Sequence, residues 1–528
     1  MNRKLLLSAV LLLAFCLRFY ALGSNPPALD WDEAALGYNA YSLLKTGRDE
    51  YAIRFPLSIK SFNDYKPPLY TYISILPVAA FGLNEFSVRF TSAFFGLLTV
   101  AAVYLLLRRL FRHQSAKLDL LAALFLAVSP WHLQFSRVAF EANLALFFLI
   151  WGIFLLTASN RRLKFYLFSA VSLALSMYAY HSPRLIVPLL LAGILWIYRS
   201  KFRDNLKQTA VFLVVFLLSV LPIAVQLQKS TSARFSSVSV VNPDEKLGES
   251  IKDIEFDQEK GIPLGRLFHN RRLVYFREIL GGYLDHFNFD FLFLTGDPPG
   301  RHHASGMGML YLWELPFILA GIFLVIARLK EKKSWQLFAW WFLAAPVASA
   351  LTSGTPHAVR ALFYLPLYQI LSATGLLNLR KSFRFLVIPL FTFSFFYYLH
   401  LYYVITPFEY SDWWQYGYKE SILTARQIED RVDKVVVTYR YDQPYIFYLF
   451  YNLIDPGQYQ EISRNLEIKR SERVIGKYEF RNIDWSKDKE LTKTLFVSAP
   501  GEIPEDDGEL IKEINFLNGQ PAFRLVLR

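Results

Sequence analysis

The chain has 528 residues, 54% of them hydrophobic and 17% aromatic, and a formal net charge of +13. So apolar a composition excludes an ordinary soluble globular protein and favours helices that lie in a bilayer. The positive charge does not by itself indicate nucleic acid, and we expect no nucleic-acid partner. The single cysteine, Cys16, excludes an intramolecular disulfide.

Apolar runs of spanning length recur up to residue 405 and predict a polytopic helical membrane domain over residues 1–405. The first run is expected to be an uncleaved anchor, although a signal peptide would look similar. The moderately apolar stretch Leu69–Leu83, broken by Pro77, predicts an interfacial or re-entrant helix instead. The eleven predicted spans are Leu5–Leu22, Phe86–Leu107, Leu118–Phe135, Leu144–Ala158, Phe165–Tyr180, Leu185–Tyr198, Thr209–Leu227, Met309–Ala327, Trp335–Leu351, Ala361–Leu379 and Phe385–Ile405.

Basic residues gather on alternate connections, which the positive-inside rule assigns to the cytoplasm. The N-terminus is therefore expected in the cytoplasm of a multi-pass plasma-membrane protein, and the C-terminal segment outside. The basic connections carry Arg3 and Lys4; Arg108, Arg109, Arg112 and Lys117; Arg161, Arg162 and Lys164; Arg199, Lys201, Arg203 and Lys207; Arg328, Lys330, Lys332 and Lys333; Arg380, Lys381 and Arg384.

Three long segments lie on the other side, namely residues 23–85, 228–308 and 406–528. The last predicts a soluble extracytoplasmic α/β domain. Helices are expected over Asp412–Arg431 and Pro444–Leu453. Strands are expected at Lys434–Thr438, Thr494–Ser498, Ile511–Phe516 and Ala522–Leu527, with Asn518-Gly519 as a hairpin turn.

The first outer segment holds acids directly after the first span. Asp30, Asp32 and Glu33 are costly to desolvate there unless they have partners or a task. One of them would serve as general base on an acceptor hydroxyl. The alternative is a solvated acid or a cap for a helix over Ala34–Leu44. Further along, Lys66 follows Tyr65 on a side poor in positive charge, where it would hold an anionic phosphate or snorkel to the interface.

Two further outer turns carry charge. Arg137 and Glu141 are four residues apart and would share a helix face. They would either pair with each other, or Glu141 would line a pocket for the sugar or the acceptor. In Ser353–Arg360, Arg360 is expected to open the next helix, where a cation opposes the dipole and an anionic lipid phosphate would relieve the cost. His357 lies in the same turn.

A metal site is weakly indicated. Arg301 is followed by His302-His303, and Asp30 and Asp32 form an Asp-x-Asp pattern. Zinc sites use three or more ligands in most cases, so neither pattern is specific. We expect no required cofactor and name no metal ligand, and a divalent metal stays an alternative.

Together these motifs resemble the GT-C membrane glycosyltransferases, closest to the branch of protein O-mannosyltransferases and lipid A aminoarabinose transferases. The resemblance covers most of residues 1–380. It rests on Asp32-Glu33, Lys66-Pro67-Pro68-Leu69, Asn84–Arg89, the Arg137…Glu141 turn and Pro356–Arg360. It implies a GT-C fold of about eleven helices with a C-terminal extracytoplasmic α/β domain.

The resemblance also implies roles. Asp32 matches the catalytic aspartate and Lys66 a lysine that contacts the carrier phosphate. Glu141 falls where the lipid A branch has a second acid, so it is the second catalytic candidate. His357, Arg360 and Arg301 would bind the donor phosphate. Asp30, Glu33, Arg137 and Tyr65 are the remaining pocket candidates.

Two departures from the family leave the acceptor open. Ala35 stands where the lipid A branch has arginine, and residues 228–308 are too few for the insert of eukaryotic protein mannosyltransferases. The implied function is inverting transfer of one sugar from a polyprenyl-phosphate donor to a protein, lipid or cell-wall glycan, with membrane lipids as the surroundings. The alternatives are a lipid-carrier flippase and an oligosaccharide polymerase or ligase that uses a diphosphate-linked donor.

Overall fold

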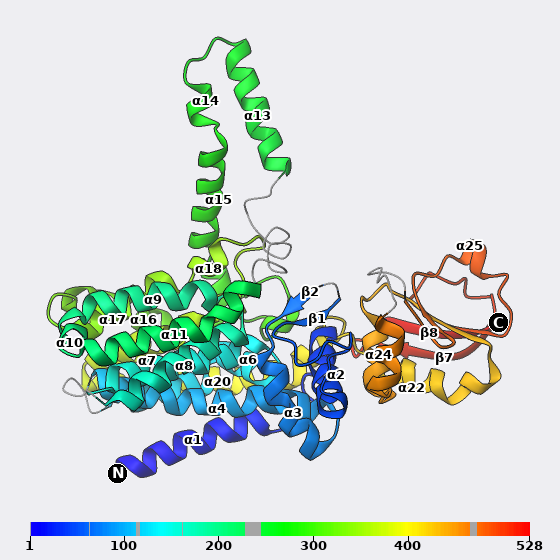
Figure 1. Ribbon diagram of the computed structural model, residues 1–528, viewed down its shortest axis with the longest axis horizontal. Coiled ribbons are helices and arrows are strands. Elements are labelled where there is room, and N and C mark those ends of the chain that lie inside the picture. Colours follow the sequence, from blue (N-terminus) through cyan, green and yellow to red (C-terminus); the bar gives the residue numbers. More distant parts are fainter. Residues whose placement is uncertain (1, 63, 112–116, 161, 227–243, 465–472) are drawn as a thin grey trace.

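The computed structural model describes residues 2–528 except 63, 112–116, 161, 227–243 and 465–472. Long helices run side by side in a bundle, and a helical arm projects sideways from it (Figure 1). A sheet lies beyond the end of the bundle that is opposite α10. The predicted connection residues Arg112 and Arg161, the end of the Thr209–Leu227 run and residues 228–243 of the second outer segment lie outside the described part.

All eleven predicted runs are helical over most of their length. The corresponding helices are α1 Arg3–Phe19, α4 Glu85–Leu110, α5 Leu118–Val128 with α6 Pro130–Arg137, α7 Glu141–Ala158, α8 Leu163–Ala179, α9 Pro183–Ile197, α11 Leu206–Gln226, α16 Leu315–Arg328, α17 Lys333–Ala344 with α18 Val347–Ala350, α19 Leu367–Asn378, and α20 Lys381–His400. A short helix, α10 Arg199–Arg203, joins α9 to α11. Single turns of 3₁₀ helix at Gly300–His302, Leu312–Glu314, Leu362–Tyr364 and Glu429–Arg431 and of π-helix at Asp290–Leu294 and Leu401–Ile405 lie in the connections.

Four helical stretches in the described part are long and apolar enough to cross a bilayer, namely Glu85–Leu110, Glu141–Ala158, Leu206–Val225 and Arg384–Glu409. The α5–α6 pair makes a fifth if it counts as one span, bent by 56°. The bend falls at Ser129-Pro130, where proline cannot donate to the preceding turn. The remaining predicted runs form shorter helices, so the protein is multi-pass with many broken or short bundle helices.

The first outer segment forms a compact platform. It consists of α2 Trp31–Thr46, the antiparallel pair β1 Ile59–Ser61 and β2 Asp64–Lys66, and α3 Leu69–Phe81. The side chain of Asp30 caps α2 by accepting from the Glu33 amide (2.8 Å), and Gly47 ends the helix in the left-handed region. The helices expected over Ala34–Leu44 and Leu69–Leu83 are thus confirmed.

The C-terminal segment forms a mixed six-stranded sheet in the order β4-β5-β3-β6-β8-β7. The predicted strands are present, and the hairpin turns at Asn518-Gly519, where Gly519 takes a positive φ. The helix expected over Asp412–Arg431 is shorter. The strands are β3 Lys434–Val437, β4 Arg473–Ile475, β5 Tyr478–Phe480, β6 Thr494–Ser498, β7 Glu509–Asn515 and β8 Pro521–Leu527, and the helices are α21 Thr406–Glu409, α22 Tyr418–Ile428, α23 Pro444–Tyr451, α24 Pro456–Arg464 and α25 Trp485–Asp488.

The sheet segment packs on the platform rather than standing apart. Tyr445 of α23 donates to Glu50 (3.2 Å), and Gln460 of α24 donates to the Ser42 hydroxyl (3.0 Å). Arg473 of β4 donates to the Tyr51 hydroxyl (3.1 Å). These buried polar contacts fix the sheet against the first outer segment.

The second outer segment forms the arm that projects from the bundle (Figure 1). It consists of α13 Asp244–Glu259, α14 Gly265–Phe268 and α15 Arg271–Asp285. The arm's base is bonded to the 353–357 turn, because Thr355 donates to Asp285 (2.6 Å) and the His357 amide to His286 (3.3 Å).

Helices α16 and α19 pack backbone to backbone through two glycines. A Cβ added at Gly375 would lie 2.1 Å from the Phe317 carbonyl oxygen, and one at Gly321 2.4 Å from that of Leu371. Small residues allow such close approach between helices.

We expect Gly375→Val to force α16 and α19 apart at a cost of about 1–3 kcal/mol, because the new side chain meets backbone rather than a flexible side chain. Thermal unfolding of detergent-purified protein measures the loss. Gly281→Val on the arm is the matched control, since no atom lies within 4 Å of its added Cβ. Equal unfolding temperatures for the two variants would contradict this packing.

Candidate active site

The platform brings a lysine and a carboxylate together at the end of the bundle, and Glu141 at the start of α7 lies close by. Lys66 ends β2 and forms an ion pair with Asp32 in the first turn of α2. Burial alone would lower the pKa of the Lys66 ammonium, but the nearby carboxylates of Asp32 and Glu141 outweigh it and raise that pKa. The Lys66 side chain is 7% exposed and that of Asp32 41% exposed, so the carboxylate is the member of the pair that solutes reach.

A second pair lies beside the first. Arg301 approaches Asp30 (Nη1 to Oδ2, 3.6 Å), and its guanidinium lies 4.6 Å from the Trp31 ring centre. Burial raises the pKa of the Asp30 carboxyl to about 6; Arg301 opposes that shift, and Asp32 and Glu33 add to it. Residues 30 to 32 therefore hold two acids, each next to a cation.

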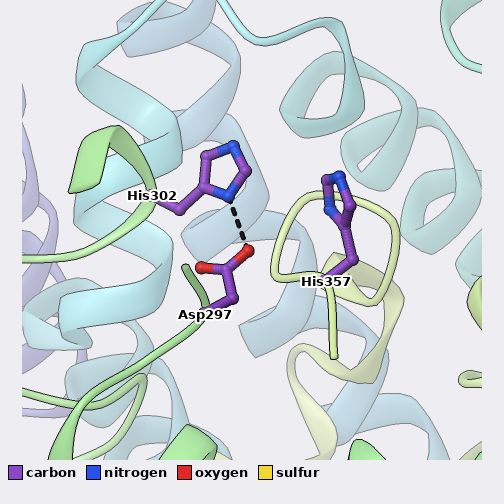
Figure 2. A group of neighbouring side chains, drawn as sticks. All are labelled: Asp297, His302 and His357. Carbon is purple, nitrogen blue, oxygen red and sulfur yellow. Dashed lines mark hydrogen bonds and ion pairs between the residues drawn. The ribbon is translucent and has the colours of Figure 1, made fainter. Parts of the chain in front are cut away.

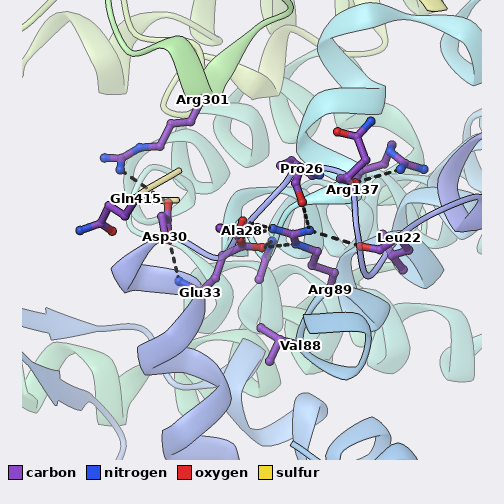
Figure 3. Close-up of polar contacts among 12 residues, drawn as sticks. Leu22, Pro26, Ala28, Asp30, Glu33, Val88, Arg89, Arg137, Arg301 and Gln415 are labelled. Atoms are coloured by element: carbon purple, nitrogen blue, oxygen red, sulfur yellow. Dashed lines mark hydrogen bonds and ion pairs between the residues drawn. The ribbon is translucent and has the colours of Figure 1, made fainter. Parts of the chain in front are cut away.

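Glu33 has a different role. Arg89 of α4 donates to both of its carboxylate oxygens (2.9 and 2.8 Å), and the Ala139 amide donates as well (2.9 Å). Arg89 also donates to the carbonyls of Pro26 and Ala28, so it gathers the chain that enters α2 (Figure 3). Both side chains are at most 2% exposed. Glu33 is thus a structural partner of a buried arginine.

Arg137 and Glu141 do not share a helix face, contrary to expectation. Helix α6 ends at Arg137 and α7 begins at Glu141, with extended residues between them. The buried Arg137 side chain donates to the carbonyls of Leu17 (2.8 Å) and Asn25 (3.0 Å) and to the Tyr402 hydroxyl (3.1 Å). These contacts join α6 to the end of α1. Tyr65 lies at the middle of β2, paired in register with Lys60.

His357 and Arg360 both lie in the 353–360 turn, but their side chains contact different partners. Arg360 donates to Thr352 Oγ1 (2.7 Å) and to the Ser353 carbonyl (2.8 Å), both in its own turn. The expectation that it opens a helix is wrong, because regular α-helix resumes only at Leu367 of α19. His357 instead faces Asp297 and His302 (Figure 2).

Asp297, His302 and His357 form a group whose ligating atoms lie within 4.8 Å of one another, and of these Asp297 and His302 are buried and His357 is half-buried. Asp297 Oδ2 accepts from His302 Nδ1 (2.6 Å) and from the Ala358 amide (2.9 Å), while its Oδ1 and His357 Nδ1 have no hydrogen-bond partner. Burial is the main cause that lowers the pKa of both imidazoles, so their nitrogen lone pairs are available. Two neutral histidines and one carboxylate are donors that suit Zn²⁺.

A contact from the C-terminal segment reaches the start of α2, between Asp30 and Asp32. Gln415 accepts a hydrogen bond from the Trp31 amide (2.9 Å) and donates to the Asp442 carbonyl (3.2 Å). The start of α2 is therefore tied to the connection that leads into the sheet.

Several of these residues were not predicted from the sequence. Arg89 lies inside a predicted span, where a buried arginine signals a required partner. Asp297 and Gln415 give no local signal. The adjacent pair His302-His303 suggests a metal, but His303 Nε2 instead contacts the Asp297 carbonyl oxygen (2.9 Å).

We expect Glu33→Gln to cost about 3–5 kcal/mol of folding free energy, because Arg89 would be left buried with an uncompensated charge. Thermal unfolding of the detergent-purified variant measures the loss. The control is Lys419→Ala, which breaks the exposed ion pair with Glu85 (2.7 Å) and is expected to cost at most about 1 kcal/mol. A Glu33→Gln variant no less stable than that control would contradict the structural role.

The comparisons with known proteins agree with this architecture. Residues 65–224 match the family model described as dolichyl-phosphate-mannose-protein mannosyltransferase. ArnT from Cupriavidus metallidurans, solved in the apo state, aligns with 99% of this chain and 97% of its own length at a TM-score of 0.56 and 13% identity. No curated protein has a significant sequence match to this chain.

The oligosaccharyltransferase of Archaeoglobus fulgidus, solved in complex with Zn and sulfate, aligns at a TM-score of 0.51 and 14% identity over 84% of this chain and 61% of its own. The same enzyme tethered to an acceptor peptide aligns at 0.49 and 13%, over 86% and 63%. This chain thus spans less than two thirds of the archaeal enzyme. The chain therefore has the fold of ArnT, a helical bundle with a C-terminal sheet segment, and the GT-C-type fold predicted from the motifs is confirmed.

Proposed function

We propose that this protein is a membrane glycosyltransferase that moves one sugar from a polyprenyl-phosphate carrier to an acceptor hydroxyl with inversion. The observation that carries the proposal is the contact between the buried Lys66 ammonium and the more exposed Asp32 carboxylate. A desolvated cation beside a solute-accessible base supplies the two functions that such a displacement needs, a partner for the leaving phosphate and an acceptor for the proton.

In this mechanism the acceptor oxygen attacks the anomeric carbon and its proton passes to Asp32. The bond from that carbon to the phosphate oxygen breaks, and the polyprenyl phosphate leaves with an added negative charge next to Lys66. Glu141, whose charge also acts on Lys66, orients the sugar or the acceptor. Because Lys66 and Asp32 pair with each other, arrival of the donor phosphate frees the carboxylate to act as base.

The second pair extends the anion site. Arg301, held by Asp30 and Trp31, is the next cation available to the phosphate. Arg360 would add positive charge near the phosphate, whereas the neutral His357 imidazole, which lies near Arg301, would offer a hydrogen bond and no charge. Tyr65 would line the pocket from β2.

The likeness to ArnT supports the donor class, because a second structure of that protein from Cupriavidus metallidurans is bound to undecaprenyl phosphate. A peptide acceptor is present in the archaeal oligosaccharyltransferase structure. The acceptor class of this chain is thus a glycan, a lipid or a protein.

Residues 1–405 would be the catalytic membrane domain and residues 406–528 a second, extracytoplasmic domain that covers the site and selects the acceptor. The distribution of basic connections supports a cytoplasmic N-terminus in the plasma membrane. The contacts of Gln415, Tyr445 and Gln460 with the first outer segment support the covering role.

We also assign a divalent metal, Zn²⁺ by donor chemistry, to Asp297, His302 and His357. Its role would be structural, because the group joins the 297–302 loop, which carries Arg301, to the turn that carries Arg360. Bound metal would satisfy the partnerless Asp297 Oδ1 and His357 Nδ1. The mechanism itself needs no metal.

Asp32→Asn should lower the transfer rate by about 10²–10⁴-fold, because the general base is lost while the shape is kept. Lys66→Ala should lower it by about 10²-fold or more, because the leaving phosphate loses its cation. Release of free polyprenyl phosphate from a sugar-loaded carrier in nanodiscs measures both.

The matched controls are Asp412→Asn, an exposed acid ahead of α22, and Lys60→Ala on β1. Both should retain wild-type turnover. Normal turnover by Asp32→Asn would refute the base assignment. Turnover only with a diphosphate-linked donor would favour a polymerase or ligase, and carrier translocation without carrier release would favour a flippase.

His302→Ala and His357→Ala should each remove most of the metal from purified protein, since loss of one ligand of three weakens a site severely. Elemental analysis by mass spectrometry gives the metal content per chain. His269→Ala, whose ring contacts Asp253 and Asp257 on the arm, should retain the metal. Metal-free wild-type protein after purification without chelator would refute the site.

A further inference from the structure

The arm carries a largely exposed apolar stripe, of which only the end at Phe268 and Leu273 borders the groove between α13 and α15. On α15, Leu273, Phe276, Leu280 and Leu284 recur at intervals of three and four residues, which places them on one face. They are 36 to 60% exposed. Leu264, Leu267 and Phe268 continue the apolar surface to the arm's tip and are 56 to 62% exposed. So much contiguous apolar surface marks an interaction site.

The helices of the arm differ in net charge, because the described part of α13 carries five acids and one lysine, whereas α14 and α15 together carry four arginines and two acids, Glu278 and Asp285. Four exposed arginines lie on α14 and α15, namely Arg266, Arg271, Arg272 and Arg277. The described acids of α13 are Glu249, Asp253, Glu255, Asp257 and Glu259. A basic helix with an apolar stripe has the chemistry of an interfacial membrane helix, whereas the acidic helix would be repelled by an anionic surface.

The direction of the arm also fits contact with a membrane surface. The bundle helices define the direction that crosses the membrane, and the arm runs across that direction from the bundle's side (Figure 1). Its base is fixed at the end of the bundle that carries the candidate site, through Thr355–Asp285 and His357–His286. Helices α14 and α15 lie on the side of the arm toward the α10 end of the bundle, and α13 lies on the side toward the sheet (Figure 1).

We propose that the arm formed by residues 244–285 lies on the surface of the membrane leaflet that is nearer to the candidate active site. The α15 stripe enters the boundary between headgroups and acyl chains, the arginines of α14 and α15 contact anionic headgroups, and α13 faces water. The lipid surface is thus continuous with the apolar exterior of the spans. Because the arm's base bonds the turn that holds His357, membrane contact would also fix the height of that turn at the interface.

Site-directed spin labelling tests the arm without measuring catalysis. In a Cys16→Ser background, single cysteines replace Leu273, Phe276 and Leu280 on the stripe. Controls replace the exposed α13 residues Lys252 and Glu255. The labelled protein is placed in nanodiscs of phosphatidylethanolamine and phosphatidylglycerol, and each nitroxide is probed with oxygen and with a water-soluble nickel chelate.

We expect the stripe positions to lose accessibility to the nickel chelate and gain accessibility to oxygen, while positions 252 and 255 stay accessible to nickel. Equal nickel accessibility on α13 and α15 would overturn the proposal. In phosphatidylcholine alone the protection should weaken, and unchanged protection would overturn the role of anionic headgroups. None of these outcomes depends on glycosyl transfer, so failure here leaves the proposed function untouched.

Discussion

The ion pair between Glu33 and Arg89 is the constraint on which the site depends. It joins the first turn of α2 to the span α4 with a bidentate contact, and Arg89 also holds the carbonyls of the chain that leads into α2. Adjacent residues on a helix point about 100° apart. With Glu33 fixed toward α4, Asp32 must point elsewhere, and the direction left to it is that of Lys66.

The remaining charges follow from that placement. Asp30 caps α2 and meets Arg301, and Asp32 meets Lys66, so the helix start is bordered by one cation from the second outer segment and one from the platform itself. In the Lys66–Asp32 pair the lysine is buried and the carboxylate is partly exposed. The carboxylate keeps the buried lysine charged and stays accessible itself. Desolvating such a pair costs free energy, and buried ionisable groups of this kind are typical of functional sites.

The second outer segment serves two distinct surfaces. Its later part, through Asp297, Arg301 and His302, reaches the site, while its helical arm leaves the bundle. The turn at 353–357 contacts both parts, because His357 faces Asp297 and His302 and its amide meets His286 at the arm's base. The position of the site relative to the lipid surface would thus be set through one short turn.

Residue periodicity and hydropathy were enough to predict the helical bundle, the platform helices and four strands of the sheet, because these depend on local patterns and on the energetics of a bilayer. The sequence did not distinguish Asp32, which faces a cation and solvent, from Glu33, which is a buried structural partner, since both sit side by side in one helical turn. The tie from Gln415 to Trp31 and the grouping of His357 with Asp297 and His302 join segments that are far apart in the chain. Arg137 and Glu141, only four residues apart, fall in different helices. Only the packing of helices and loops brings such residues together or parts them, so only the tertiary structure decided them.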